Sequence, residues 1–149
     1  MLSDYLKEEW IKLEVEAENW EDAIEKAGID LVRDKIIRRK YIEAMKKTVR
    51  EIGPYFVITK NVAIPHARSE EGAIKTGVSL VTLKNPVNFG NIENDPVKYI
   101  FCLAVKNDNE HIEILRDLSE LLEDKEFFRL LEKRKNREEI YKYIKYKKS

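Results

Sequence analysis

The chain has two histidines, and both stand where an imidazole could do chemistry. His66 follows the apolar residues 62–64 and Pro65, whose ring fixes the backbone and removes one N–H donor. The polar residues 69–72 follow shortly, so His66 is expected at the end of a strand, at the sheet rim where α/β proteins place ligands. A neutral imidazole there could act as a nucleophile or donate a hydrogen bond to a phosphate group.

His111 stands near the start of a predicted helix, directly after the capping run 107–109. A helix N-terminus carries free N–H groups and a partial positive charge, so it favours a nearby anion and disfavours an imidazolium ion. A histidine in a first helical turn can also be an ordinary solvated residue, and one after a strand can be structural. The residues alone therefore leave a catalytic and a structural role open for both histidines.

Two arginines are candidates for neutralising a phosphoryl group. Arg68 lies two residues after His66, and its planar guanidinium could hold phosphoryl oxygens. Arg50 lies in the last turn of a predicted helix, where its charge could simply complement the helix C-terminus. The histidines could instead bind a metal ion with Asp108 or Glu110, but His-x-x-x-His spacing is absent, and we predict no metal site.

Cys102 is the only cysteine, so the sequence allows neither an intrachain disulfide nor a zinc site built on two thiolates. Its apolar neighbours predict a buried thiol with a raised pKa and a structural role. The chain also lacks a Gly-x-x-x-x-Gly-Lys-Ser/Thr run, so nucleotide hydrolysis by a P-loop is unsupported. We predict no cofactor.

The first third of the chain predicts one strand and two helices. Residues 11–17 alternate between apolar and polar types, which indicates a half-buried strand at a sheet edge. Asn19 with Asp22 indicates a helix N-terminus, and Gly28 is expected to end that helix. A second helix is predicted over residues 39–52.

The rest of the chain passes from strand to helix periodicity. Residues 55–59, 76–83 and 97–105 are β-rich, and the last run is almost wholly apolar, as in a strand covered on both faces. From Asn109 onward one helical stripe of apolar residues is expected in the core: Ile112, Leu115, Leu118, Leu121 and Leu122. Helices at both ends around a buried sheet predict an α/β fold: a single three-layer domain over residues 1–149, with a mixed β-sheet flanked by helices on both faces.

The composition excludes several classes of protein. The 28 Lys and Arg residues balance 28 Asp and Glu residues, which argues against a dedicated nucleic-acid binder and an acidic disordered tail. The first residues lack the basic start and apolar core of a signal peptide, and no uncharged stretch approaches the ~20 residues that span a bilayer. We therefore predict a cytoplasmic protein with no nucleic-acid partner and no direct membrane insertion.

Six segments, taken in order, resemble the successive motifs of a known family. They are residues 19–24, 53–58, 62–68, 77–80, 86–90 and 107–112. The family is the enzyme IIA domain of the bacterial phosphoenolpyruvate-dependent sugar phosphotransferase system, of the mannitol/fructose type. The Gly-Pro-Tyr run at Gly53 and the Pro-His-Ala-Arg run at Pro65 are most similar to its ascorbate-type branch.

The resemblance implies a phosphoryl relay between proteins. His66 matches the histidine that accepts a phosphoryl group from the carrier protein HPr and passes it to a cysteine of enzyme IIB, which serves the membrane component IIC. His111 matches a second active-site histidine that hydrogen-bonds the phosphoryl group, and Arg50 stands where some members carry a phosphate-neutralising arginine. The protein in such a transfer mainly supplies positioning and positive potential, which these groups and Arg68 could provide without a metal.

A second interpretation of the same resemblance is a regulatory module. Its phosphorylation state would control a partner protein rather than sugar uptake. The surface of such a module could be identical to that of a transport component, so the two interpretations differ in their partners and not in their fold.

Overall fold

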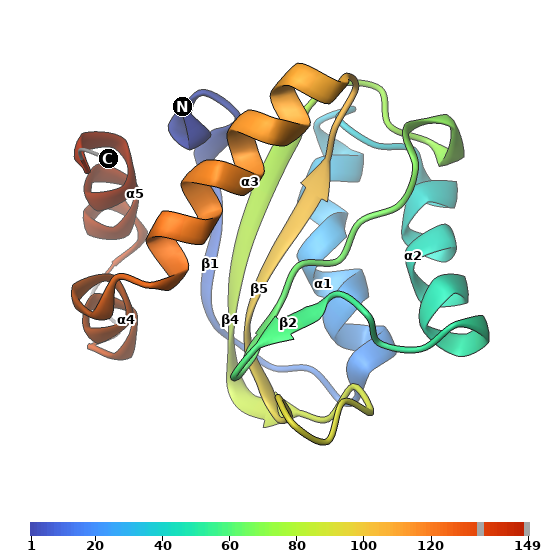
Figure 1. The fold of residues 1–149 in the computed structure, drawn as a ribbon, viewed down its shortest axis with the longest axis horizontal. Coiled ribbons are helices and arrows are strands. Elements are labelled where there is room, and N and C mark those ends of the chain that lie inside the picture. Colours follow the sequence, from blue (N-terminus) through green and yellow to red (C-terminus); the bar gives the residue numbers. More distant parts are fainter. Residues whose placement is uncertain (134–135, 148–149) are drawn as a thin grey trace.

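The computed structural model describes residues 1–133 and 136–147, and a five-stranded mixed sheet lies at its centre (Figure 1). The strands are β1 (Leu6–Val15), β2 (Val57–Thr59), β3 (Val62–Ala63), β4 (Gly77–Val87) and β5 (Val97–Ala104). Their order across the sheet is β1-β4-β5-β3-β2. The β1–β4 and β3–β5 pairs are parallel, whereas the β4–β5 and β2–β3 pairs are antiparallel. The predicted mixed sheet is confirmed.

Helices cover both faces of this sheet (Figure 1). One face carries α1 (Trp20–Arg33) and α2 (Arg39–Glu51), and the other carries α3 (Asp108–Leu122), α4 (Lys125–Glu132) and α5 (Arg137–Tyr146). Two 3₁₀ turns, η1 (Leu2–Asp4) and η2 (Ser69–Glu71), complete the elements. The predicted three-layer arrangement is confirmed. Within the described ranges, no helix combines the length and apolarity needed to cross a membrane.

Strand β5 lies in the middle of the sheet and separates the two cores. Its side chains alternate between them: Ile100 and Cys102 pack towards α1 and α2, whereas Phe101 and Leu103 pack towards α3, α4 and α5. Burial raises the pKa of the Cys102 thiol to about 12, and its sulfur lies 3.9 Å from the sulfur of Met45. The thiol is therefore a core group, as its apolar neighbours predict.

The edge position predicted for the first strand is confirmed, but the predicted end of the first helix is wrong. Helix α1 continues through Gly28 to Arg33. A Cβ atom at Gly28 would lie 2.9 Å from Cδ1 of Ile42 on α2, so the glycine allows the two helices to approach closely. Gly53, by contrast, has a φ of +120° just beyond α2, which is a conformation that favours glycine.

The apolar stripe predicted along the third helix is only partly in the core. Leu118 and Leu121 are buried together with Ile114, but Ile112 is 65% exposed and Leu115 is 40% exposed. Ile114, Leu118 and Leu121 share one helix face, which packs on the sheet, and Ile112 lies on another face. The structure thus leaves two apolar side chains exposed next to His111.

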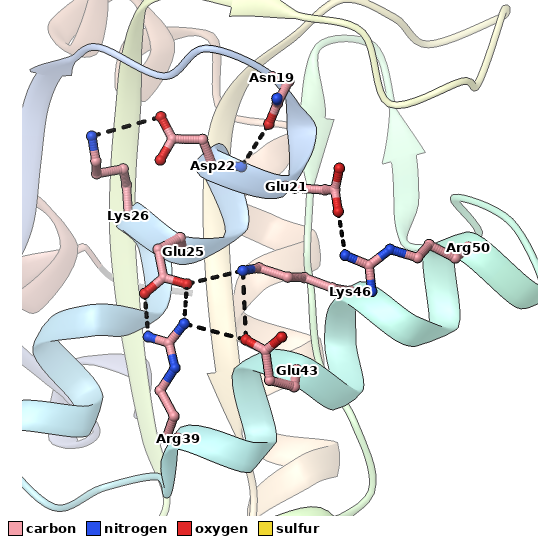
Figure 2. Close-up of polar contacts among 9 residues, drawn as sticks. All are labelled: Asn19, Glu21, Asp22, Glu25, Lys26, Arg39, Glu43, Lys46 and Arg50. Atoms are coloured by element: carbon pink, nitrogen blue, oxygen red, sulfur yellow. Dashed lines mark hydrogen bonds and ion pairs between the residues drawn. The ribbon is translucent and has the colours of Figure 1, made fainter.

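Ion pairs join α1 to α2 around Glu25 (Figure 2). Its carboxylate accepts hydrogen bonds from the guanidinium of Arg39 and, at 3.0 Å, from Nζ of Lys46. Both cations also pair with Glu43, at 3.2 Å from Arg39 and 3.6 Å from Lys46. The side chains of Glu25 and Lys46 are only 24% and 12% exposed, so water screens this contact weakly. Hydrogen bonding from Arg39 lowers the pKa of Glu25 to about 2.

We expect Glu25→Gln to reduce the free energy of unfolding at pH 7 by about 1 kcal/mol, because Arg39 and Lys46 lose the less exposed of the two carboxylates that they share. The pKa of Glu25 is lower in the folded chain than its ordinary 4.5, so its stabilising effect is complete above pH 4.5 and lost as the pH falls towards 2. Urea unfolding at pH 7 and at pH 2 should therefore show that the loss of unfolding free energy caused by Glu25→Gln is smaller at pH 2.

The control is Glu138→Gln, which removes an exposed partner of Lys142 on α5 and should change the unfolding free energy little. A Glu25→Gln deficit as large at pH 2 as at pH 7 would contradict the assignment of this pH dependence to Glu25.

Candidate active site

His66 lies just beyond β3, where the chain leaves the sheet. Its ring is half-buried and meets the ring of Tyr55 edge-on, with 5.7 Å between the centroids. Nδ1 of His66 lies 2.8 Å from the carbonyl oxygen of Ile64. A carbonyl oxygen can only accept a hydrogen bond, so Nδ1 carries the proton and the neutral ring keeps its lone pair on Nε2. Nε2 is therefore the nucleophilic atom of His66.

A network of hydrogen bonds fixes the first turn of α3, which carries His111. Asn107 caps the helix by accepting a 2.9 Å bond from the N–H of Glu110. The carboxylate of Glu110 accepts hydrogen bonds from Thr76 at 2.7 Å and from the Asn107 amide at 2.8 Å. Because Thr76 directly precedes β4, these bonds fix the first turn of α3 to the sheet and set the position of His111.

The structure brings the two histidines together, with 6.5 Å between their ring centroids. Both line a cavity of about 880 Å³, which also receives residues from α2, from the segment between β3 and η2, and from the start of α3. Lys47, Arg68 and Lys106 line it as cations. Its carboxylates are those of Glu51, Glu70, Glu71 and Asp108. Within residues 1–133 and 136–147, no three or more His, Cys, Asp or Glu side chains are grouped to hold a metal ion.

Arg68 lies at the mouth of this cavity. Its side chain is 77% exposed, and its Nε lies 3.3 Å from Glu71 and 3.6 Å from Glu70. Two carboxylates therefore compensate the charge of Arg68 in this arrangement. Since the side chain is long and exposed, it could turn towards an anion bound beside His66.

Arg50 is placed differently from the other candidates. Its guanidinium pairs with Glu21 on α1 (Figure 2). It also lies 5.8 Å from the centroid of the Trp20 ring. It is about 200° around α2 from Thr48, a residue that lines the cavity. Among the described residues lining the cavity Arg50 is absent, so the structure does not bring it to the histidines.

Lys47 is one of two lining cations that the sequence analysis did not single out; the other is Lys106, whose Nζ donates to the carbonyl oxygen of Ala73 at 3.3 Å. Lys47 is the one without such a partner in the described structure. It projects from α2 into the cavity lining and, among the residues that the structure describes, has no ion-pair partner. In the sequence it is one of several cations in the helix at residues 39–51, and nothing local distinguishes it. The one available signal is helical spacing, which puts Lys47 on the same face as Ala44 and Glu51.

These groups can perform one kind of chemistry well. A nucleophilic nitrogen, a second imidazole, a helix N-terminus and a cation surround a space that can hold a small anionic group. A transferring phosphoryl group spreads negative charge over its outer oxygens and requires such positive potential more than it requires further covalent chemistry.

The model of the family described as "Phosphoenolpyruvate-dependent sugar phosphotransferase system, EIIA 2" matches residues 4–147. The ascorbate-specific EIIA component of Escherichia coli K12 is 40% identical over 136 residues, which cover 90% of this chain and 88% of that protein.

Solved structures agree with this similarity. The mannitol-specific cryptic enzyme IIA CmtB of E. coli has a TM-score of 0.85 and 34% identity, covering 96% of this chain and 97% of that one. Enzyme IIA of the mannitol system of E. coli, in a complex with phosphorylated enzyme IIB, has a TM-score of 0.72 and 29% identity, covering 85% and 88%. The family resemblance inferred from the motifs is confirmed. The chain belongs to the EIIA 2 family of the phosphoenolpyruvate-dependent sugar phosphotransferase system and is one of that system's phosphotransferase components.

Proposed function

We propose that the protein is a phosphocarrier in which Nε2 of His66 accepts a phosphoryl group from phospho-HPr and passes it to a cysteine of an enzyme IIB. The observation that carries this proposal is the pairing of the two rings in one cavity: His66 has Nδ1 tied to a carbonyl and Nε2 free, and His111 stands 6.5 Å away. Residues 1–149 would act as one domain, because strands from both halves of the chain pair with one another in one sheet.

Each step exchanges one bond to phosphorus for another. The lone pair on Nε2 attacks phosphorus, and the P–N bond of the donor breaks as the donor imidazole leaves with its electron pair. In the second step a thiolate attacks phosphorus, and Nε2 of His66 leaves with its pair. The proton on Nδ1 stays in place throughout, held by the carbonyl of Ile64.

The neighbouring groups would stabilise charge in transfer. His111 can donate a hydrogen bond to a phosphoryl oxygen, and the first turn of α3 adds the partial positive charge of a helix N-terminus. Lys47 adds a full charge that no carboxylate compensates among the described residues, and Arg68 adds another when it turns from Glu71. We do not assign this role to Arg50, because its guanidinium pairs with Glu21.

Exposed apolar side chains around the cavity support exchange between proteins. Ile52 and Tyr55 line the cavity and are 77% and 51% exposed, and Ile112 next to His111 is 65% exposed. Apolar side chains gathered at the edge of a charged cavity are typical of a surface that meets protein partners. HPr and enzyme IIB would dock here in turn.

Transport is the role that the comparisons support over regulation. The 40% identical relative is an ascorbate-specific EIIA component of the phosphotransferase system, and a related enzyme IIA has been solved with its phosphorylated IIB. We therefore propose a cytoplasmic component of an ascorbate-type uptake system, serving a membrane IIC through IIB. Phosphoryl transfer from this protein to an ascorbate-type IIB, and none to a mannitol-type IIB, is the result that this proposal requires.

We expect His66→Ala to abolish phosphorylation, because the variant lacks the attacking nitrogen. Incubation of the wild-type protein with phosphoenolpyruvate, enzyme I and HPr should attach an acid-labile, base-stable phosphate. Mass spectrometry or radiolabelling measures this phosphate. Labelling of His66→Ala equal to that of the wild type would exclude His66 as the acceptor.

We expect His111→Ala to keep some acceptance of phosphate while onward transfer to IIB falls by about a hundredfold, because a donor to the developing charge is lost. Rapid mixing of the phosphorylated variant with IIB measures this rate. Transfer at the wild-type rate would remove His111 from the proposed mechanism.

We expect Lys47→Gln to slow phosphoryl acceptance about tenfold, which corresponds to ~1.4 kcal/mol of transition-state stabilisation. The control is Lys125→Gln, which removes an exposed lysine from α4 and should leave the rate unchanged. The rate constants are compared at low and high salt, since salt screening should narrow the difference between wild type and Lys47→Gln. Equal effects of the two substitutions would mean that Lys47 has no special place at the site.

A further inference from the structure

We propose that the hydroxyl of Tyr41 is a positioning group for His66, because it is inserted into the β3–β5 ladder at the point where the chain leaves the sheet. This inference rests on the proposed function, in which His66 is the phosphorylated residue. Tyr41 lies on α2 and is completely buried, so its hydroxyl must find its partners within the protein.

The register of the sheet shows what the hydroxyl replaces. In the parallel β3–β5 pair, Val62 lies opposite Tyr99 and Ala63 lies opposite Ile100. Extending this register places His66 opposite Leu103. In a parallel ladder, Leu103 would then donate to the carbonyl of residue 65 and accept from the N–H of residue 67.

Only the first of these two bonds is made directly. The N–H of Leu103 donates to the carbonyl of Pro65 at 3.0 Å. In place of the second, the Tyr41 hydroxyl accepts from the N–H of Ala67 at 3.0 Å and donates to the carbonyl of Leu103 at 2.7 Å. The backbone of Leu103 therefore holds the chain on both sides of His66. Its N–H bonds Pro65 directly, and its carbonyl is linked to Ala67 through the Tyr41 hydroxyl.

The hydroxyl suits this place because it can donate and accept at once. Burial raises the pKa of Tyr41, so the group stays protonated and keeps its donor. The carbonyl of Ala67 also lies 3.0 Å from the hydroxyl, but the single proton can be fully given to only one acceptor, and Leu103 is nearer.

The insertion has a direct consequence for the imidazole. The Tyr41 hydroxyl keeps Ala67 at a distance from β5, while Pro65 stays hydrogen-bonded to Leu103 of β5. The backbone therefore turns away from the sheet at His66, and the ring reaches the cavity. Without the hydroxyl, Ala67 can either close onto Leu103 or move freely, and both changes misplace Nε2. Positional errors of this kind are costly because phosphoryl transfer depends on an aligned approach.

The experiment compares Tyr41→Phe, which keeps the ring, with Tyr143→Phe. Tyr143 also donates a partly buried hydrogen bond, to Asp124 at 2.5 Å, but it belongs to α5 on the opposite face of the sheet. Transfer from phospho-HPr is measured with increasing donor, and the imidazole ¹⁵N signals of both histidines are recorded by NMR. Thermal unfolding shows whether both variants are folded.

We expect Tyr41→Phe to lower kcat about tenfold with little change in KM, and to shift or broaden the His66 signals while those of His111 stay in place. Tyr143→Phe should lower the thermal midpoint but change neither the rate nor the spectrum. An unchanged kcat, an unchanged His66 spectrum, or equal rate losses in both variants would each overturn the proposal.

The failure of this proposal and of the proposed function can be told apart. If the wild-type protein takes up no phosphate, the proposed function fails, and the NMR comparison still decides whether Tyr41 sets the His66 ring. If the wild type is phosphorylated and Tyr41→Phe matches it in rate and spectrum, only the role of Tyr41 fails.

Discussion

The geometry of the site depends on one constraint: the hydrogen bonds that hold the backbone on both sides of His66, where the chain leaves β3 and its pairing with β5 ends. The N–H of Leu103 holds Pro65, and the carbonyl of Ile64 holds the His66 ring through Nδ1. Both groups belong to the backbone of buried residues at the rim of the central sheet, so this backbone sets the direction of the free nitrogen. The close packing of α2 against α1, at Ile42 and Gly28, helps to place the lining residues of α2 beside that nitrogen.

The balance of charges follows from what a relay must do. Three cations and four carboxylates line the cavity, and two of the carboxylates pair with Arg68. A strongly positive cavity would bind the phosphoryl group tightly and hold it, whereas a carrier has to release it to the next protein. The zero net charge of the whole chain says little by itself, but the near balance within this cavity suits reversible transfer between partners that dock in turn.

The sequence predicted the layers and most elements, because periodicity and caps are local properties. Asn19 and Asn107 cap their helices through side-chain hydrogen bonds, as residue type alone indicates. The helix end predicted at Gly28 is wrong because a glycine that ends a helix and a glycine that lets another helix approach cannot be distinguished in the sequence until the packing partner is known. For a related reason the sequence does not show which cations of α2 reach the cavity. Lys47 lines the cavity whereas Arg50 pairs with Glu21, and only packing decides which side of the helix faces the cavity.

Helix α3 shows why the exposed apolar residues were missed and what they do for the site. Its core face, with Ile114 and Leu118, fixes the helix on the sheet. The same turn carries His111 and Ile112 on other faces, so the imidazole that we propose contacts the phosphoryl group and an exposed apolar side chain move as one body. A hydrophobic stripe predicted from the sequence includes residues of both faces, because apolar residues in the core and apolar residues that contact a partner are of the same types. Burial separates the two kinds of residue, because the apolar side chains that the folded chain leaves exposed beside the histidine cavity are those that partner proteins can contact.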